Sequence, residues 1–485
     1  MEEKKQVVIV GGGVAGICAG IYCARQGLDC AIYEGHTTVG GNLTGWTREG
    51  HTIDNCIHWL TGTREGNELN RLWQEVGVLD GRTSVHRRPY FYESEWQGKR
   101  LGLSGCPYET ANRMIALSPC DEKEIDRFIR TVLALEPIVA GGTWNEKSEI
   151  LARIPDLIYY KRMTLAELAS KFHHPLLRLC MTDYLSGEFC ALALLCAYAA
   201  YASGNGSLPV GGSLAAAKRM ECTCRAAGCE IHTGTRVQKI TVKNGRATGI
   251  VLESGERIHA DYVIAACDPS VTFTHLLPHS FLPARLERRI NDPRAPIFSA
   301  VQIAFSCDKE FLPTFGTRII EAPEIKGINQ GRLPLREYSD ETSFAPEGKT
   351  VLQAYLFQRE KDANEWICLA RDTASYRARK EALATTVTKQ ILSAFPTLDG
   401  HISVLDVWTP ATYHRYFGAR AGAFLSNAMT PSTPLGTHST HVRHLKNFSL
   451  ATQWLASPGG LPIAAKVGKR AATDAVRALK PRGVA

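Results

Sequence analysis

The first segment of the chain has the apolar pattern of a β-α-β unit. Residues 7–10 are all apolar, as in a strand that is covered on both faces of a parallel sheet. Helical spacing of apolar positions follows over residues 14–26, and Gly27 ends the predicted helix. A second apolar run occupies residues 30–33. Farther on, residues 51–63 alternate between apolar and polar side chains, which predicts a strand that enters a loop.

The middle of the chain is predicted to be helical and then to return to alternating strands and helices. Residues 90–203 follow helical periodicity for most of their length. Their most apolar stretch, residues 190–202, is shorter than the roughly twenty residues of a membrane-spanning helix, so we expect a buried helix. Residues 206–268 then predict a glycine turn, a helix, a hairpin with its turn at residues 244–245, and a buried strand.

The last part of the chain completes the predicted fold. Two strand-like runs, residues 298–305 and 350–357, predict a second sheet, and the chain closes with a strand, a Pro-Gly-Gly turn and a helix from about Pro462. We therefore predict an α/β fold that combines a discontinuous Rossmann-type nucleotide-binding domain with a mixed α+β substrate domain. The nucleotide-binding domain is expected to comprise residues 1–90, 204–290 and 431–485, and the substrate domain a helical or cap part over 91–203 and a mixed sheet over 291–430.

The glycine-rich turn after the first strand predicts an adenine dinucleotide. Gly11, Gly13 and Gly16 have G-x-G-x-x-G spacing, which permits a tight turn, a close approach of backbone to a diphosphate, and close packing of helix on strand. The helix that starts at Val14 and Ala15 would point its N–H groups at the diphosphate. The second strand ends at an acid that can accept hydrogen bonds from an unphosphorylated ribose, and a glycine pair beyond it offers another close backbone approach; these residues are Glu34, Gly40 and Gly41.

Composition and charge are ordinary for a globular protein. The 485 residues are 44% hydrophobic and 21% charged, with a net charge of +8, and no block of lysine and arginine resembles a nucleic-acid-binding arm. We therefore expect no nucleic-acid partner. Basic residues lie beside aromatic ones at residues 86–93 and 158–163, which leaves two interpretations: a solvated face, or contact with an anionic membrane surface.

The cysteines do not form a disulfide or zinc pattern. The chain has 15 of them, an odd number, scattered through apolar segments and without a C-x-x-C pair. Cys222, Cys224 and Cys229 lie close together but lack the further ligands of a zinc site, so no metal is expected. We expect no secretory signal peptide before the first strand. The location we expect is the cytoplasm, with reduced thiols, and association with a membrane surface is left open.

The chain resembles one family over nearly its whole length. It is similar to the FAD-dependent phytoene desaturase, carotenoid isomerase and retinol saturase branch of the flavin amine oxidase superfamily. The motifs that carry the resemblance lie at residues 7–42, 206–240, 259–270, 409–418 and 457–472. The resemblance implies FAD as the cofactor. It also implies that Val237 contacts the adenine through its backbone, that Cys267 lies near the adenosine, and that the turn of Gly459, Gly460, Leu461 and Pro462 presents the Leu461 N–H to the flavin pyrimidine edge.

Two positions depart from the superfamily pattern. Asn42 follows the glycine pair where the superfamily usually has arginine or a similar basic residue, so one phosphate or ribose contact differs. Amine oxidases have an aromatic residue at the position of Gly460, where it forms one wall of a cage for the amine. The glycine removes that wall, which argues against amine oxidation and favours a broader, flatter substrate.

The resemblance also identifies candidate catalytic residues. The segment 54–59 corresponds to the one that runs past the flavin ring in the family. The residues expected to face the ring are Asp54, Asn55, Cys56 and His58. A histidine with a near-neutral pKa could exchange a proton with the substrate; the alternative is that His58 is a hydrogen-bonded loop or core residue. Nothing that flanks Cys56 in the sequence lowers its pKa. Weaker candidates on the substrate side, where packing is the simpler role, are Tyr413, Arg415 and Tyr416.

The predicted function is an FAD-dependent oxidoreductase that desaturates, saturates or isomerises carbon–carbon double bonds of a small apolar substrate, isoprenoid, carotenoid-like or acyl. Its electron partner is left open among oxygen, a quinone and NAD(P)H, because no second nucleotide fingerprint follows a strand. Two alternatives remain. One is a flavin amine oxidase, and the other is a non-catalytic prenyl carrier of the GDP-dissociation-inhibitor type, against which the intact glycine turn and Glu34 argue.

Overall fold

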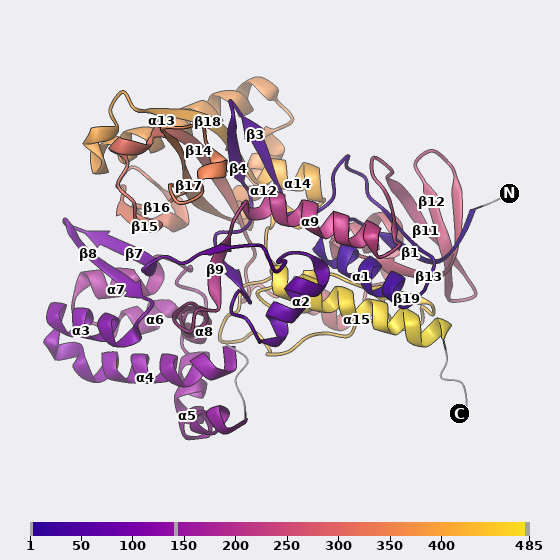
Figure 1. Cartoon of the computed structure of the whole chain (residues 1–485), viewed down its shortest axis with the longest axis horizontal. Coiled ribbons are helices and arrows are strands. Elements are labelled where there is room, and N and C mark those ends of the chain that lie inside the picture. The colour runs from indigo at the N-terminus through magenta and orange to yellow at the C-terminus, as the bar shows by residue number, and fades with distance from the viewer. Residues whose placement is uncertain (1–2, 140–143, 481–485) are drawn as a thin grey trace.

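The computed structural model describes residues 3–139 and 144–480 and is built around two seven-stranded sheets (Figure 1). The first, which we call the nucleotide sheet, has the strand order β10-β2-β1-β13-β12-β11, and β19 joins it beside β13. The bounds of its strands are β1 (Glu3–Val10), β2 (Cys30–Tyr33), β10 (Glu230–His232), β11 (Val237–Lys243), β12 (Arg246–Leu252), β13 (Arg257–Ala265) and β19 (Phe448–Leu450). The predicted α/β class with a discontinuous Rossmann-type sheet is confirmed.

Three remote segments of the chain meet in this nucleotide sheet. β1 pairs in parallel with β2 and with β13, where Val8 lies opposite Val263. β13 in turn pairs in parallel with β19, where Val263 also lies opposite Phe448. All these strands have buried side chains on both faces, as their continuous apolar sequences require. The limits of the predicted domains stay a prediction.

Three helices cover the nucleotide sheet: α1 (Val14–Arg25), α9 (Gly212–Ala226) and α15 (Leu461–Leu479). α1 packs along α15 and also contacts α9 (Figure 1). α15 begins one residue earlier than predicted, so that Pro462 occupies its second position, where a missing N–H costs no helical hydrogen bond. Close to the start of α1 the two helices are in contact: a Cβ atom on Gly468 of α15 would lie 2.2 Å from the carbonyl oxygen of Ala15.

The second sheet has the order β18-β14-β17-β16-β15-β7-β8. Its strands are β7 (Tyr90–Trp96), β8 (Lys99–Ser104), β14 (Phe298–Asp308), β15 (Thr317–Glu321), β16 (Arg332–Glu337), β17 (Lys349–Arg359) and β18 (Ile402–Trp408). The prediction of helix was wrong for residues 90–104, which form the hairpin β7–β8. The physical reason is tertiary: β7 pairs with β15, more than two hundred residues farther along the chain, and the hairpin turns at Gln97 and Gly98, both with positive φ.

The rest of the predicted helical part is helical, and we call it the helical block. It contains α3 (Pro107–Leu117), α4 (Glu122–Val139), α5 (Trp144–Arg162), α6 (Leu165–Ala169), α7 (Pro175–Thr182) and α8 (Ala191–Ala202). α8 is the buried helix expected from its apolar sequence, with Leu194, Leu195 and Tyr198 fully covered. Among the described residues, no helix combines the length and the apolar character that crossing a bilayer requires.

The remaining elements connect these parts. They are α2 (Glu68–Val76), β3 (Gly45–Arg48), β4 (His51–Asp54), β5 (Leu60–Thr61), β6 (Val85–His86), β9 (Gly206–Pro209), α10 (Pro269–Val271), α11 (Ala284–Ile290), α12 (Glu360–Leu369), α13 (Thr373–Ala394) and α14 (Pro410–Phe417). Figure 1 shows the nucleotide sheet with α1, α9 and α15 at one end of the molecule, and the second sheet and the helical block at the other.

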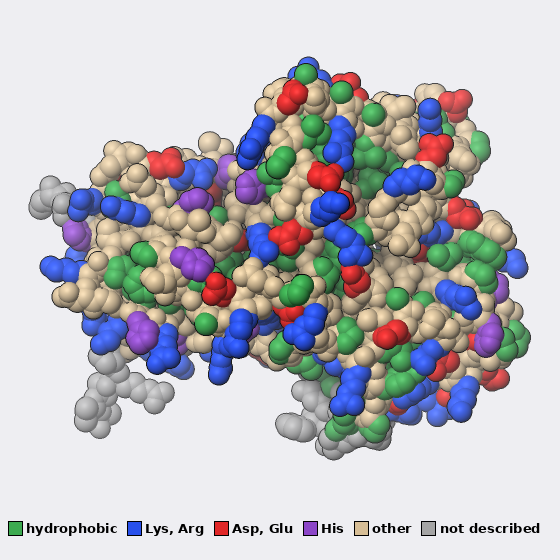
Figure 2. All heavy atoms as spheres, turned by 180° about the vertical axis from the view of Figure 1, so that it is seen from behind, with side chains coloured by type: hydrophobic (Ala, Val, Ile, Leu, Met, Phe, Trp, Pro, Cys, Tyr) green, Lys and Arg blue, Asp and Glu red, His purple; other side chains and the backbone are tan. Residues whose placement is uncertain are grey.

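The basic and aromatic stretch at residues 86–93 was predicted to be a solvated face or a contact with an anionic membrane surface. Both interpretations require exposed side chains, and part of the stretch is buried. Arg88 is buried and pairs with the buried carboxylate of Glu337 at 2.7 Å, and Tyr92 is fully buried. On the face shown in Figure 2, lysine and arginine side chains are spread among acidic and hydrophobic ones. Membrane contact and a cytoplasmic location stay predictions.

Candidate active site

A large cavity lies between the nucleotide sheet and the second sheet. Its volume is about 1980 Å³, whereas sites for one small ligand commonly measure about 300–1,000 Å³. It runs from the carboxyl ends of β1, β2 and β13 to the second sheet and α8. Of the residues predicted for the site, Gly16 and Asp54 do not line this cavity. The predicted residues that line it are Gly11, Gly13, Val14, Ala15, Glu34, Gly40, Gly41, Asn42, Asn55, Cys56, His58, Val237, Cys267, Gly459, Gly460, Leu461 and Pro462, together with the weaker candidates Tyr413, Arg415 and Tyr416.

The glycines of the first turn have different physical roles. A Cβ atom on Gly16 would lie 1.9 Å from the carbonyl oxygen of Gly11, so this glycine allows α1 to pack against the turn and does not face the cavity. A Cβ atom on Gly13, the N-cap of α1, would meet no heavy atom of the described chain within 4 Å. Gly13 therefore keeps open the space in which a diphosphate can approach the backbone.

Glu34 lies at the nucleotide end of the cavity in a fixed orientation. Its Oε2 atom accepts a hydrogen bond from the Gly12 N–H at 2.7 Å, and its Oε1 atom accepts one from the His36 N–H at 2.8 Å. Val237 and Cys267 line the same end, and the Cys267 thiol donates to the Val10 carbonyl oxygen at 3.3 Å. This end therefore brings together the predicted ribose and adenine contacts.

A second helix N-terminus opens into the middle of the cavity. Gly460 is the N-cap of α15, with φ of +88°, a conformation that favours glycine over any aromatic residue. Its N–H donates to Oε1 of Gln453 at 2.7 Å. Neither α1 nor α15 has an acidic residue in its first turn. The partial positive charge at each N-terminus is therefore not neutralised by a side chain of the same helix turn, and it faces the cavity.

Asp54 anchors the segment that leads to the candidate catalytic residues. Its buried carboxylate accepts hydrogen bonds from the N–H and the hydroxyl of Ser213, both at 2.6 Å, and from the N–H groups of Cys56 and Ile57 at 2.9 and 3.0 Å. Burial raises the pKa of Asp54, and the hydrogen bonds from Ser213 act in the opposite direction. Asp54 does not line the cavity, so the expectation that it faces the flavin was wrong: its carboxylate is used by the fold, and it is a positioning residue.

Asn55 belongs to a buried polar network in the middle of the cavity. Its amide nitrogen donates to the Asn42 carbonyl oxygen at 3.0 Å, and its amide oxygen accepts from Trp408 Nε1 at 3.0 Å. The same Trp408 N–H contacts the hydroxyl of Tyr413 at 3.0 Å, and Gln302 donates to that hydroxyl. The sequence analysis did not identify Gln302 or Trp408 as site residues. Gln302 could have been noticed because it is a polar residue within an apolar stretch of β14.

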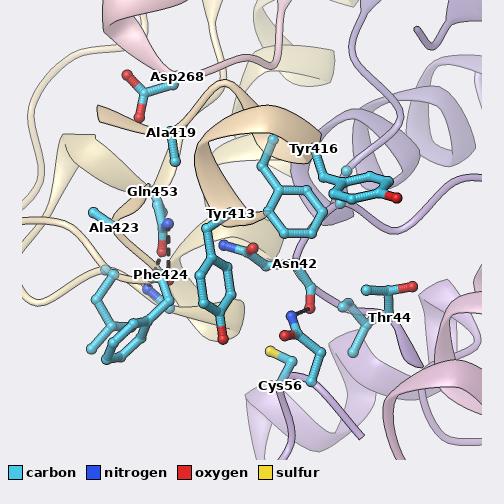
Figure 3. A pocket seen from close by; sticks show the side chains of 18 of the residues that line it. Asn42, Thr44, Cys56, Asp268, Tyr413, Tyr416, Ala419, Ala423, Phe424 and Gln453 are labelled. Atoms are coloured by element: carbon cyan, nitrogen blue, oxygen red, sulfur yellow. Dashed lines mark hydrogen bonds between the residues drawn. The ribbon is translucent and has the colours of Figure 1, made fainter. Parts of the chain in front are cut away.

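Cys56 faces the cavity from the same segment. Figure 3 shows its thiol and the hydroxyl of Tyr413 directed toward the same space, while Tyr416 lies at the edge of the pocket. Burial raises the pKa of the Cys56 thiol, and the negative charge of Asp54 adds to the effect. The thiol is therefore protonated at neutral pH, which does not favour a nucleophilic role.

His58 lies deeper, on the substrate side. Its ring packs edge-on against Tyr355, with 4.4 Å between ring centroids, and its Nε2 atom has no hydrogen-bond partner in the part of the chain that the structure describes. Burial lowers the pKa of His58 to about 3, and the positive charge of Arg336 contributes. The expectation of a near-neutral pKa was wrong, because the folded protein surrounds this histidine with apolar and cationic groups. Its catalytic role stays a prediction.

This pKa predicts how stability depends on pH. Between pH 6.5, the ordinary pKa, and about pH 3, the unfolded chain holds a proton on His58 that the folded protein does not. The free energy of unfolding should therefore fall by about 1 kcal/mol for each pH unit below 6.5 through this group. Urea unfolding at pH 7, 6 and 5 should show a smaller decline for His58→Gln than for the natural chain. Parallel declines would mean that the folded protein protonates His58.

A family comparison identifies the protein class. The family model of flavin-containing amine oxidoreductases matches residues 14–476. The chain belongs to this flavin-containing family. Membership of the family establishes FAD as the cofactor and an oxidoreductase as the class of enzyme. An oxidoreductase is an enzyme, so membership of this family argues against the alternative of a non-catalytic prenyl carrier.

Individual relatives are more distant. The flavoprotein is 26% identical over 288 residues to "4,4'-diaponeurosporene oxygenase" of Staphylococcus aureus strain bovine RF122 / ET3-1, a match that spans 56% of this chain and 58% of that relative. Its fold is similar to that of an oxidoreductase from Methanosarcina mazei, with a TM-score of 0.61, 17% identity and coverage of 95% and 98% of the two chains. It is also similar to cyclohexylamine oxidase from Brevibacterium oxydans IH-35A, with a TM-score of 0.59, 16% identity and coverage of 98% and 99%.

The cavity of this flavoprotein fits FAD. Gly13 leaves its backbone open to a diphosphate, and Glu34 presents a carboxylate at the nucleotide end. The buried side-chain oxygen of Asn42 has no hydrogen-bond partner among the described residues and is available to a ligand donor. At the other end of the predicted cofactor site, Leu461 is the first residue of α15. These residues would hold the two ends of the cofactor.

Proposed function

We propose that this flavoprotein acts on carbon–carbon bonds of an apolar substrate, by desaturation, saturation or isomerisation. The observation that carries the proposal is the composition of the cavity on the substrate side. Phe189, Ala193 and Ala197 line it from the helical block, and Phe298 and Ile319 line it from the second sheet. An extended apolar molecule matches such walls.

Several features of the chain support carbon–carbon chemistry over amine oxidation. Gly460 provides no aromatic wall, and its positive φ explains why an aromatic residue is disfavoured there. The charge that lowers the pKa of His58 belongs to Arg336. It is positive and would repel an ammonium group. A relative named for 4,4'-diaponeurosporene supports the same choice.

The contributions of the chain to such a reaction are orientation and exclusion of water. Bound FAD supplies a centre that can accept or donate a hydride. The apolar walls hold the reacting carbon without water, and the Asn55–Trp408–Tyr413 network fixes the segment that faces it. The N-terminus of α15 places its partial positive charge at Leu461, where it would stabilise negative charge. Oxygen, a quinone or NAD(P)H remains the proposed electron partner.

Product analysis with two classes of compound tests the proposal. The FAD-loaded protein, oxidised in one sample and reduced with dithionite in another, is mixed without oxygen with all-trans-retinol or with putrescine and benzylamine. We expect the polyene to lose or gain two hydrogens, or to change isomer, and the amines to leave the flavin absorbance at about 450 nm unchanged. Bleaching by an amine, with the polyene unaltered in both samples, would overturn the proposal.

A further inference from the structure

A buried arginine on the substrate side of the cavity has no acidic partner. Arg336 lies on β16 and lines the cavity, yet the residue is only 6% exposed. No carboxylate of the described chain lies within salt-bridge distance of it. Its Nε atom has no hydrogen-bond partner there, and its Nη1 atom donates to the Thr317 hydroxyl at 3.2 Å.

Other buried arginines of the same sheet region are paired. Arg318 contacts Glu93 at 2.8 Å, and Arg332 makes two hydrogen bonds to the Asp183 carboxylate, at 2.9 and 2.6 Å. A buried charge without a partner costs folding free energy, and for this reason such groups are rare in proteins unless a ligand completes them. Arg318 and Arg332 have carboxylate partners within the protein, whereas Arg336 has none among the described residues.

The groups around Arg336 are neutral and several can donate hydrogen bonds. The guanidinium lies 5.5 Å from the ring centroid of Tyr338, and its charge also affects His58 and Tyr184. Tyr184 accepts a hydrogen bond from Trp59 Nε1 at 2.6 Å, so its own hydroxyl hydrogen is free for another acceptor. Tyr355, by contrast, uses its hydroxyl hydrogen on Gln353. Arg336 and Tyr184 both line the cavity, so a cation and an unused O–H donor border the same space.

We propose that Arg336 binds a carboxylate at one end of the substrate, and that the substrate is therefore an apolar chain with a terminal acid. This inference rests on the proposed function, since it names the class of apolar molecule. The planar guanidinium matches a carboxylate in geometry, and one cation balances one negative charge. A diphosphate would call for more positive charge than this part of the cavity supplies. The apolar walls described above then hold the rest of the chain.

Binding of a matched acid and ester tests the inference. The probes are cis-parinaric acid, a fluorescent polyene acid, and its methyl ester, titrated into the FAD-loaded protein. A buried charge-assisted contact of this kind predicts that the acid binds at least about tenfold more tightly than the ester. Equal affinities would overturn the inference and leave the proposed function intact, because the ester would still occupy the apolar cavity. Binding of neither probe would count against the proposed function itself.

Variants locate the preference for the acid. Arg336→Gln should abolish the difference between acid and ester, Arg336→Lys should retain part of it, and Arg415→Gln, which removes a positive charge from the exposed edge of the same cavity, should leave it unchanged. Thermal unfolding without ligand distinguishes a binding role of Arg336 from a structural one, because only a structural role predicts a lower melting temperature for the variant. Arg336→Gln should melt at the same temperature or higher, since it removes an unpaired buried charge. A clear loss of stability together with unchanged acid preference would show that Arg336 serves the fold alone.

Discussion

Replacement of Asp54 by alanine is expected to lower the free energy of unfolding by about 3–5 kcal/mol. The carboxylate accepts four hydrogen bonds, from two groups of Ser213 and from the N–H groups of Cys56 and Ile57, and it is completely buried. Alanine would leave the two donors of Ser213 and the Cys56 N–H without this acceptor inside the protein, whereas the Ile57 N–H would keep the Ser213 hydroxyl oxygen. Each unsatisfied buried donor costs free energy. The loss should appear in urea unfolding curves.

Two further variants separate the hydrogen bonds from the volume of the side chain. Asp54→Asn keeps the shape and one oxygen, which can accept the three hydrogen bonds now made to Oδ1, but it turns an N–H₂ group toward the Ser213 N–H. It should therefore destabilise the protein clearly, but less than alanine does. Ser213→Ala removes only a hydroxyl that donates to Asp54 and accepts from the Ile57 N–H, and should cost about 1–2 kcal/mol. An Asp54→Asn protein as stable as the natural chain would contradict this account of the segment.

The second large effect concerns two glycines three positions apart. Gly13→Ala should leave the fold of the protein without FAD intact, because its Cβ would enter open space and its φ of −72° suits alanine, but it should sharply weaken retention of FAD. Gly16→Ala should instead destabilise the protein by about 1–3 kcal/mol or more, because its Cβ would lie 1.9 Å from the Gly11 carbonyl oxygen.

Thermal unfolding and the flavin content of the purified variants provide the comparison. We expect Gly13→Ala to separate the two readouts, with a normal melting temperature in the protein stripped of FAD and little bound flavin. For Gly16→Ala both readouts should fall together. Equal flavin content in Gly13→Ala and the natural protein would mean that the diphosphate does not approach this glycine.

Local sequence patterns predicted the parts of the structure that depend on neighbouring residues. The run 7–10, the turn at Gly11 and the helix that follows are set by apolar continuity and backbone freedom within thirty residues, and the structure has them at the predicted places. The hairpin at 90–104 was missed because its pairing partner β15 lies far along the chain. Periodicity carries no information about such a partner.

The site shows the same division. The residues of the glycine turn and of the turn before α15 could be found from motifs, since their chemistry depends on backbone geometry within a short segment. The pKa of His58 and the isolation of Arg336 could not, because both depend on what the second sheet and the helical block bring near them. In the strand around Arg336, the sequence RLPLRE showed only a charged residue in an alternating pattern.

The central position of β13 has a consequence for the synthesis of the protein. This strand pairs with β1, which is synthesised long before it, and with β19, which is synthesised long after it, and α15 then covers α1. Until β19 and α15 have been synthesised, the nascent chain therefore carries a nucleotide sheet that lacks β19 and a cavity that lacks the Gly460–Leu461 wall. Cofactor loading must wait for these two segments, and chaperones that meet the nascent chain before then meet it with that apolar edge uncovered.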